Sequence, residues 1–208
     1  VIVEVGSGGG FLKEVMPNAT TSDVFDLPDI DMVFSALEMP FEESSIDAIL
    51  MLDVLHHLPD PRAFFAEAVR CLKPAGRIVM IEPANTLWSR FIYMNFHHEP
   101  FDINAGWEPP RAGPLSQGNG AIPWIIFRRD RRIFEKEFPT LRIIRTRRHS
   151  PLRYLLSGGF TLRQLAPSFT YPLLKFLELM LSPANAILSM FETIELQKTG
   201  IVPKLGEY

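Results

Sequence analysis

Two pairs of adjacent histidines are the side chains best suited to proton transfer in this chain. One pair stands in "DVLHHL", directly after an apolar run, and the other stands in "FHHEPFD". Imidazole titrates close to neutral pH, so a histidine beside a bound substrate can remove a proton from it. The candidate catalytic residues are therefore His56, His57, His97 and His98, and Glu82, at the end of a later apolar run, is expected close to them.

The histidines of "FHHEPFD" also raise the question of a metal site. Adjacent histidines in an extended strand point to opposite faces, and the helical HExxH spacing does not occur. We therefore predict no metal ligands and interpret the segment as part of a lid that closes over a substrate. Aromatic side chains would form the apolar wall beneath that lid. They are Trp88, Tyr93, Phe96 and Trp107.

A glycine-rich turn in "VIVEVGSGGGFLKEV" follows the first apolar run. A strand that passes through such a turn into a helix usually binds a nucleotide-like ligand. The ending Gly-Lys-Ser/Thr of the P-loop is absent, which argues against a nucleoside triphosphate. A dinucleotide turn needs a third small residue where this chain has the bulky Phe11. The turn therefore argues against both of these ligand classes.

Strand and helix signals alternate through the first half of the chain, with short connections between them. Asp60 and Pro61 supply a capping carboxylate and a proline at the first helical position, so a helix is expected to begin there. This rhythm predicts an α/β fold with a parallel, doubly wound sheet. The expected strands are 1–5, 20–24, 30–36, 46–52 and 77–82, with a short helix over 11–16. The runs 1–5 and 46–52 are predicted to be strands buried on both faces.

The second half of the chain is less regular. Residues 97–120 are rich in Gly, Pro and Asn and are expected to form a long loop. A helix is expected over 121–137 and a strand over 141–147, where apolar and basic residues alternate. A helical stretch follows at 171–190, with a break at Pro183. The segment "FETIELQKTG" then predicts a last strand, antiparallel to 141–147.

Composition is that of an ordinary globular domain. The chain has 208 residues, of which 47% are hydrophobic and 22% are charged. The single cysteine, Cys71, excludes an intramolecular disulfide and suits a reducing compartment. No membrane span or signal peptide is expected, so we predict a cytoplasmic protein. The chain begins without Met inside an expected strand, which suggests that preceding residues are missing.

Charge is distributed unevenly along the chain. Residues 1–60 hold twelve acids against one lysine, whereas residues 128–163 hold ten arginines. The basic stretch fits either a solvated surface or an anionic partner such as a phosphate or lipid headgroups. Nucleic acid is not expected as a partner, because basic and aromatic residues do not interleave as in a binding module.

Five motifs stand in order and at matching spacing. They are "VEVGSGGG", "SD" at 22–23, "SALEMPF" at 35–41, "IDAILMLDVLHHL" at 46–58 and "RCLKPAGRIVMIEP" at 70–83. Together they resemble the class I S-adenosylmethionine-dependent methyltransferases, in the small-molecule branch with an "LHH" turn. The resemblance implies a Rossmann-like, mostly parallel seven-stranded sheet whose last strand is antiparallel. It also implies transfer of a methyl group from S-adenosyl-L-methionine, leaving S-adenosyl-L-homocysteine.

The resemblance further implies roles in cofactor binding. Glu4 would orient the glycine turn and the amino group of the cofactor, and Asp23 would hold the ribose hydroxyls, with Asp26 and Asp29 as competitors. Ser35 stands where the family commonly has an acid that accepts from the adenine amino group, so that contact would be weaker. Val24 and Leu37 would sandwich the adenine. The full expected set is Glu4, Gly6, Ser7, Gly8, Gly10, Asp23, Val24, Ser35, Ala36, Leu37, Asp53 and Val54.

We expect a single methyltransferase domain over 1–208, with a cofactor-binding half, 1–83, and a substrate-side half, 84–208. The substrate-side half would contain the lid loop 97–120 and a helical insertion at 150–190. That insertion is unusually apolar, so it would pack on the sheet, cover a hydrophobic acceptor site or rest on a membrane surface. The acceptor would be small, hydrophobic or anionic, and lipid- or glycan-linked acceptors are included.

Two other functions remain open at this stage. One is a non-catalytic relative that binds the cofactor and acts as an interaction module, which the Ser35 replacement leaves room for. The other is an NAD(P)-dependent oxidoreductase on the same sheet. Phe11, in place of the third small residue of a dinucleotide turn, argues against the second. The motifs leave the oligomeric state and the identity of the acceptor open.

Overall fold

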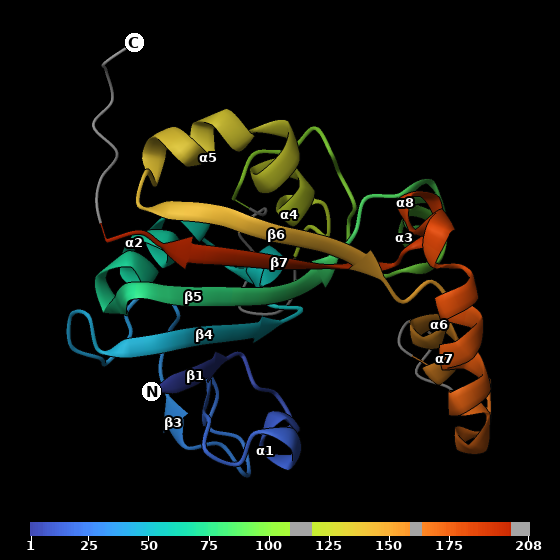
Figure 1. Cartoon of the computed structure of the whole chain (residues 1–208), viewed down its shortest axis with the longest axis horizontal. Coiled ribbons are helices and arrows are strands. Elements are labelled where there is room, and N and C mark those ends of the chain that lie inside the picture. Colours follow the sequence, from blue (N-terminus) through green and yellow to red (C-terminus); the bar gives the residue numbers. More distant parts are fainter. Residues whose placement is uncertain (109–117, 159–163, 201–208) are drawn as a thin grey trace.

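Seven strands form one sheet in the computed structural model, which describes residues 1–108, 118–158 and 164–200 (Figure 1). The strand order is β3-β2-β1-β4-β5-β7-β6. The strands are β1 (Ile2–Val5), β2 (Thr20–Asp23), β3 (Met32–Val33), β4 (Ile46–Leu52), β5 (Leu72–Pro83), β6 (Leu141–His149) and β7 (Phe191–Lys198).

The directions of the strands confirm the predicted fold class. Neighbours from β3 to β5 pair in parallel, and β7 lies antiparallel to both β5 and β6. Strands from both halves of the chain therefore belong to the same sheet. The carboxyl ends of β1, β2, β4 and β5 meet at one edge, which is where ligands bind in open α/β sheets.

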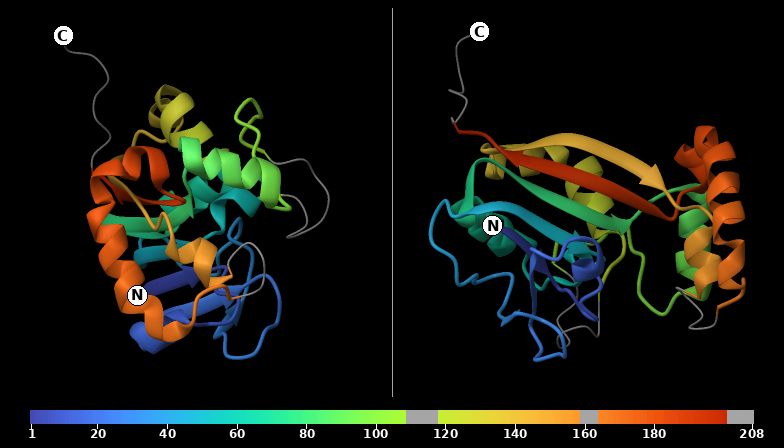
Figure 2. Two further views of the ribbon diagram at one scale, coloured as in Figure 1. Left: turned by 90° about the vertical axis from the view of Figure 1, so that its right-hand side faces the viewer. Right: turned by 60° about the horizontal axis from the view of Figure 1, so that its bottom comes forward.

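Apart from α1, which lies near β1, the α-helices are arranged at two places around this sheet (Figure 1). Figures 1 and 2 show α2, α4 and α5 on one face, whereas α3, α6, α7 and α8 lie beyond the end towards which β4 and β5 point. The α-helices are α1 (Leu12–Val15), α2 (Pro61–Cys71), α3 (Leu87–Phe96), α4 (Ile122–Trp124), α5 (Arg131–Glu137), α6 (Arg153–Ser157), α7 (Tyr171–Met180) and α8 (Asn185–Leu188). The short turns are the 3₁₀ turns η1 (Leu55–His57), η3 (Ser168–Thr170) and η4 (Ser182–Ala184) and the π-helical η2 (Ile125–Arg129). In the ranges that the structure describes, no helix is long and apolar enough to cross a membrane.

Helix α2 begins as the sequence predicts. The carboxylate of Asp60 accepts a hydrogen bond from the backbone N–H of Ala63 at 2.9 Å, and Pro61 occupies the first helical position. The fully buried Phe65 then packs against aromatic rings of η2, α5 and the turn after α5. Its ring centroid lies 5.9 Å from Phe127 and 5.1 Å from Phe134. This aromatic cluster joins the helices to one face of the sheet.

The opposite face of the sheet is partly uncovered, which differs from the prediction for residues 46–52. Ile49 and Met51 are buried, but Leu50 is only half-buried and Leu52 is 57% exposed. Strand β4 is therefore buried on one face only. The run is apolar throughout because the side chains of its second face line a cavity and are not covered by helices.

Several boundaries also differ from the sequence-based prediction. The strand expected over 30–36 is limited to Met32–Val33, and β5 begins at Leu72, earlier than 77. The early start comes from an extra pairing of Leu72 with Ile46 before an irregularity in the register. The helix expected over 121–137 is divided into α4, η2 and α5. The loop expected over 97–120 includes residues 109–117, which lie outside the described part.

Candidate functional site

The glycine turn after β1 adopts backbone conformations that L side chains rarely take. Gly6, Gly8 and Gly10 have φ angles of 71°, 50° and 70°. A Cβ atom at Gly6 would lie 2.6 Å from a methyl group of Val54, whereas one at Gly8 would meet nothing within 4 Å. Gly6 is therefore needed for packing of the turn against the end of β4, and Gly8 leaves the turn open to a ligand.

Asp23, the last residue of β2, faces this turn. Its Oδ2 accepts a hydrogen bond from the backbone N–H of Gly8 at 3.1 Å, and its Oδ1 accepts from Phe25 at 3.2 Å. Next to it, the backbone N–H of Ser22 donates to the hydroxyl of Ser7 at 3.0 Å. The turn and the end of β2 are thus held together by short contacts between side chains and backbone.

Glu4 presents a buried carboxylate beside the same turn. The residue is 7% exposed, and its Oε2 atom has no hydrogen-bond partner among the described residues. Burial raises the pKa of Glu4, although a hydrogen bond from Ser7 opposes this. A buried oxygen without a partner is costly, so this atom is suited to accept from a bound ligand.

A cavity of about 1360 Å³ opens between the glycine turn, the sheet and helices α6 and α7. The uncovered sheet face contributes Leu50, Leu52, Val79 and Ile81, and the helices contribute Tyr154 and Leu174 among others. Five of the predicted cofactor residues line it. They are Glu4, Gly6, Ser7, Gly8 and Asp53.

The other predicted cofactor residues lie near the turn or further along the sheet edge. They are Gly10, Asp23, Val24, Ser35, Ala36, Leu37 and Val54, and they do not line the large cavity. The hydroxyl of Ser35 accepts a hydrogen bond from the backbone N–H of Leu37 at 3.2 Å, so it stabilises its own turn. Ala36 is buried and Val24 is exposed. Their predicted contacts with adenine stay predictions.

His56, on η1 after β4, is fixed by Glu82 of β5. The Nδ1 atom of His56 lies 2.7 Å from Glu82 Oε2, and both side chains are buried. The other oxygen of Glu82 accepts from the backbone N–H groups of Val54 and Leu55 at 3.0 and 2.7 Å. Burial lowers the pKa of His56, but its contacts with Glu82 and Glu99 outweigh that effect and raise the pKa to about 10. The expected proximity of Glu82 is confirmed.

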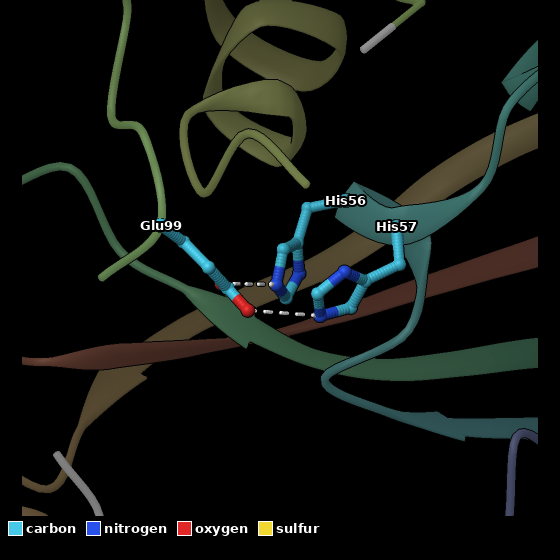
Figure 3. Close-up of side chains that lie close together, drawn as sticks. All are labelled: His56, His57 and Glu99. Carbon is cyan, nitrogen blue, oxygen red and sulfur yellow. Dashed lines mark ion pairs between the residues drawn. The ribbon is translucent and has the colours of Figure 1, made fainter. Parts of the chain in front are cut away.

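Glu99, in the segment after α3, faces both histidines of η1 (Figure 3). Its carboxylate oxygens lie 3.4 Å from His56 Nε2 and 3.5 Å from His57 Nε2. Burial raises the pKa of Glu99, but the neighbouring histidines outweigh that effect and lower it to about 2. The Nδ1 atom of His57 is buried without a hydrogen-bond partner in the described part of the chain.

The expectation that His97 and His98 point to opposite faces is wrong. Their rings stack with centroids 4.6 Å apart and an interplanar angle of 26°, because they follow the end of α3 in a bend and not in a strand. His97 Nδ1 accepts from the backbone N–H of Glu99 at 3.2 Å, and its Nε2 lies 3.5 Å from the hydroxyl of Tyr154. The side chain of His98 is 78% exposed.

A second, small cavity of about 10 Å³ lies beside His56 and His97. That volume is room for about one water molecule. His56, His97 and Glu99 line it, and Asp53 and Tyr154 line both cavities. None of the four candidate histidines lines the large cavity itself.

Sequence reasoning missed three residues of this region. Glu99 stands inside "FHHEPFD", where only the histidines were considered, although a carboxylate next to two histidines is itself a signal. His149, at the end of β6, lines the large cavity and contacts the hydroxyl of Thr193 at 2.9 Å. Tyr154, on α6, had no local pattern that could reveal its position.

Comparisons with known proteins point to methyltransferases. Residues 3–80 match the family model described as a methyltransferase domain. The chain is 38% identical over 45 residues to 27-O-demethylrifamycin SV methyltransferase from Amycolatopsis mediterranei. This alignment covers 22% of this chain and 16% of that protein. It is 31% identical over 97 residues to ubiquinone biosynthesis O-methyltransferase from Idiomarina loihiensis. That alignment covers 37% of this chain and 40% of the relative. The matches thus span well under two thirds of these relatives.

The fold also has solved counterparts. A S-adenosylmethionine-dependent methyltransferase from Thermotoga maritima, described as a possible histamine N-methyltransferase, superposes with a TM-score of 0.56 at 15% identity. The alignment covers 95% of this chain and 82% of that one. At this identity the likeness concerns the fold. Residues 3–80 therefore match the methyltransferase domain family, and the chain has the fold of a solved S-adenosylmethionine-dependent methyltransferase.

Proposed function

We propose that this chain binds S-adenosyl-L-methionine and transfers its methyl group to a small, apolar acceptor. One observation carries the proposal: the Oε2 atom of Glu4, which lacks a partner in the described part of the chain, and the open glycine turn border the same cavity as an apolar sheet face. A polar end and an apolar wall in one cavity suit a cofactor with an amino-acid end beside a hydrophobic acceptor.

The residues present fit the cofactor. The carboxylate of Glu4 would accept hydrogen bonds from its ammonium group, and the backbone at Gly6 and Gly8 would approach its amino-acid portion closely. Asp23 would hold the ribose hydroxyls, and the turn containing Ser35 would contact the adenine. When bound, the cofactor supplies a methyl group activated by a positively charged sulfur.

The chain's own contribution is alignment and exclusion of water. Leu50, Val79 and Ile81 offer a flat apolar surface for the acceptor, and Leu174 faces the cavity from α7. By their names, the relatives act on 27-O-demethylrifamycin SV or in ubiquinone biosynthesis, which supports a small-molecule acceptor. Lipid-linked acceptors belong to the same proposal.

Tyr154 is placed to contact the reacting end of the acceptor. It lines both cavities, and burial raises the pKa of its hydroxyl, so the group keeps its proton at neutral pH. His97 Nδ1 already accepts a hydrogen bond, so a neutral His97 carries its proton on Nε2, towards the oxygen of Tyr154. We infer that Tyr154 donates a hydrogen bond to the acceptor and that the predicted base is one of the histidines beside it.

Isothermal titration with S-adenosylhomocysteine tests the cofactor, with NAD⁺ as the matched control ligand. We expect one S-adenosylhomocysteine site per chain and no heat of binding from NAD⁺. Binding of NAD⁺ alone would overturn the proposal. Methyl transfer is then tested with a panel of quinol, phenol and amine acceptors, and cofactor binding without turnover on any of them would favour a non-catalytic interaction module.

A further inference from the structure

The carboxylate of Glu99 and the imidazoles of His56 and His57 are spaced like ligands of one metal ion. One nitrogen or oxygen atom from each lies within 4.8 Å of the others. The two nitrogen–oxygen distances, 3.4 and 3.5 Å, exceed those of good hydrogen bonds. Two ligands on a tetrahedral ion with bonds of about 2.0–2.2 Å lie about 3.3–3.6 Å apart. The observed distances therefore suit two ligands that share an ion.

The orientation of His56 supports the same reading. Its Nδ1 atom is held at 2.7 Å by Glu82, whose other oxygen is bound to two backbone N–H groups. This fixed carboxylate occupies the Nδ1 side of the ring, so Nε2, which faces Glu99, is the nitrogen left to bind a metal ion in place of its proton. A carboxylate behind a histidine in this way orients the ring and increases its basicity in metal sites.

We propose that His56, His57 and Glu99 form a binding site for one divalent transition-metal ion, with Zn²⁺ as the representative ion. Two imidazoles and one carboxylate favour such an ion, whereas Mg²⁺ and Ca²⁺ prefer sites made of oxygen. The carboxyl groups of Glu82 and Glu99 beside the imidazoles also favour a cation. The earlier expectation of no metal rested on a strand geometry for "FHHEPFD" that the structure does not have.

A second group of similar composition, Asp53 with His56 and Glu82, is less suitable. It would use the side of His56 that already donates to Glu82, and Glu82 is occupied by backbone N–H groups. The ion is therefore assigned to the side that faces Glu99.

Three protein ligands leave one coordination position of a tetrahedral ion free. The small cavity beside His56 and Glu99 has room for about one oxygen atom, and it shares Asp53 and Tyr154 with the large cavity. The free position would therefore hold a water molecule or an oxygen of the acceptor. Binding of an acceptor oxygen at this position rests on the proposed methyl transfer, whereas binding of the ion itself does not.

The test measures metal binding alone, on protein without an affinity tag and freed of metal with a chelator. After equilibrium dialysis against Zn²⁺ we expect one ion per chain. Glu99→Gln and His57→Gln should each weaken binding at least tenfold, because each removes one of three ligands. His149→Gln, which changes a histidine outside the cluster, is the matched control and should retain the wild-type affinity.

A second variant and a spectrum separate ligation from structure. Glu82→Gln should weaken Zn²⁺ binding by about 10–100-fold without removing a ligand. Co²⁺ in place of Zn²⁺ should give the strong visible absorption of a four- or five-coordinate ion, and Glu99→Gln should abolish it. Circular dichroism and thermal unfolding confirm that each variant is folded.

Two outcomes would overturn the proposal. One is no retained Zn²⁺ in the folded wild-type protein, and the other is equal retention in the wild type, Glu99→Gln and His57→Gln. The cluster would then be an ion-pair network only. Because no cofactor or acceptor is present in these measurements, their failure leaves the titration with S-adenosylhomocysteine unaffected, and a failed titration leaves the metal result unaffected.

Discussion

The buried carboxylate of Glu4 is suited to binding and unfavourable for folding. Without a ligand, its Oε2 atom is removed from water and has no partner among the described residues. The raised pKa of Glu4 has the same origin, because burial penalises the charged form. Stability should therefore increase as the pH falls through this raised pKa, and a neutral replacement should relieve the penalty at pH 7.

We predict that Glu4→Gln leaves the thermal midpoint of the ligand-free protein unchanged or raises it at pH 7. The same variant should bind S-adenosylhomocysteine at least tenfold more weakly, because it loses a charge-assisted contact with an ammonium group. Differential scanning calorimetry and isothermal titration provide the two readings. A variant with lower stability and full affinity would show that Glu4 has a structural role only.

The two glycines of the turn offer a matched comparison. Gly6→Ala should destabilise the protein by about 1–3 kcal/mol, because a residue with positive φ would also contact Val54. Gly8→Ala has a positive φ but open space around its Cβ, so we expect a smaller loss of stability. Chemical denaturation measures both. Equal losses would contradict the argument from packing.

At the residue scale, the sequence predicted the glycine turn, and the family resemblance placed Asp23 in the same cofactor site. They did not predict the position of Glu99, which approaches His56 across 43 positions of sequence because the segment after α3 passes next to η1. Contacts such as that of Glu99 with His56 depend on how the elements pack, and the residue spacing within "FHHEPFD" cannot predict them.

At the scale of elements, helix α2 is tied to the segment between β3 and β4 by Glu67. Its Oε1 atom accepts a hydrogen bond from the backbone N–H of Met39 at 2.8 Å, and its Oε2 atom accepts from Arg70 at 2.8 Å. Arg70 also donates to the carbonyl oxygens of Met39 and Phe41. The hydrogen bond from Arg70 lowers the pKa of Glu67, which connects this contact to acid stability.

We predict that Glu67→Gln lowers the unfolding free energy at pH 7 by roughly 1–2 kcal/mol. A lowered pKa stabilises the fold above the ordinary pKa of glutamate, and this stabilisation is lost as the pH falls through the lowered value. The difference between wild type and variant should therefore decrease on acidification. Glu135→Gln, in an exposed pair with Arg131, is the control and should change stability by less than about 0.5 kcal/mol. A pH-independent difference at Glu67 would contradict this account.

Strong local patterns predicted elements better than weak ones. The apolar run of β4 and the capped start of α2 appear where the sequence places them. The short β3, the early start of β5 and the division of 121–137 were not predicted, because pairing with neighbours and local helix geometry determine them. Exposure of Leu52 was missed for the same reason, since the apolar run does not reveal what covers each face.

At the scale of the whole molecule, α7 carries a large apolar surface away from the core. Phe176 is 56% exposed and Leu179 is 64% exposed, and Figures 1 and 2 show the helix projecting beyond the end of the sheet. The expectation that this segment simply packs on the sheet therefore does not hold for its outer face. Surfaces of this kind mark contacts with another molecule.

We predict that purified protein associates reversibly as its concentration rises and that Phe176→Ser with Leu179→Ser reduces this association. Sedimentation velocity at several concentrations measures the effect. The double variant should retain its thermal midpoint within a few degrees, because neither side chain is buried. If the double variant associates as strongly as the wild type, the contact does not involve this surface of α7.

The uncovered face of β4 and β5 has one more practical consequence. Its floor is a hydrogen-bonded sheet, so the hollow above it keeps its shape when no ligand is present. A dye whose fluorescence increases in apolar surroundings should bind in this cavity. Candidate acceptors that bind there would displace the dye, and the loss of fluorescence would rank their affinities.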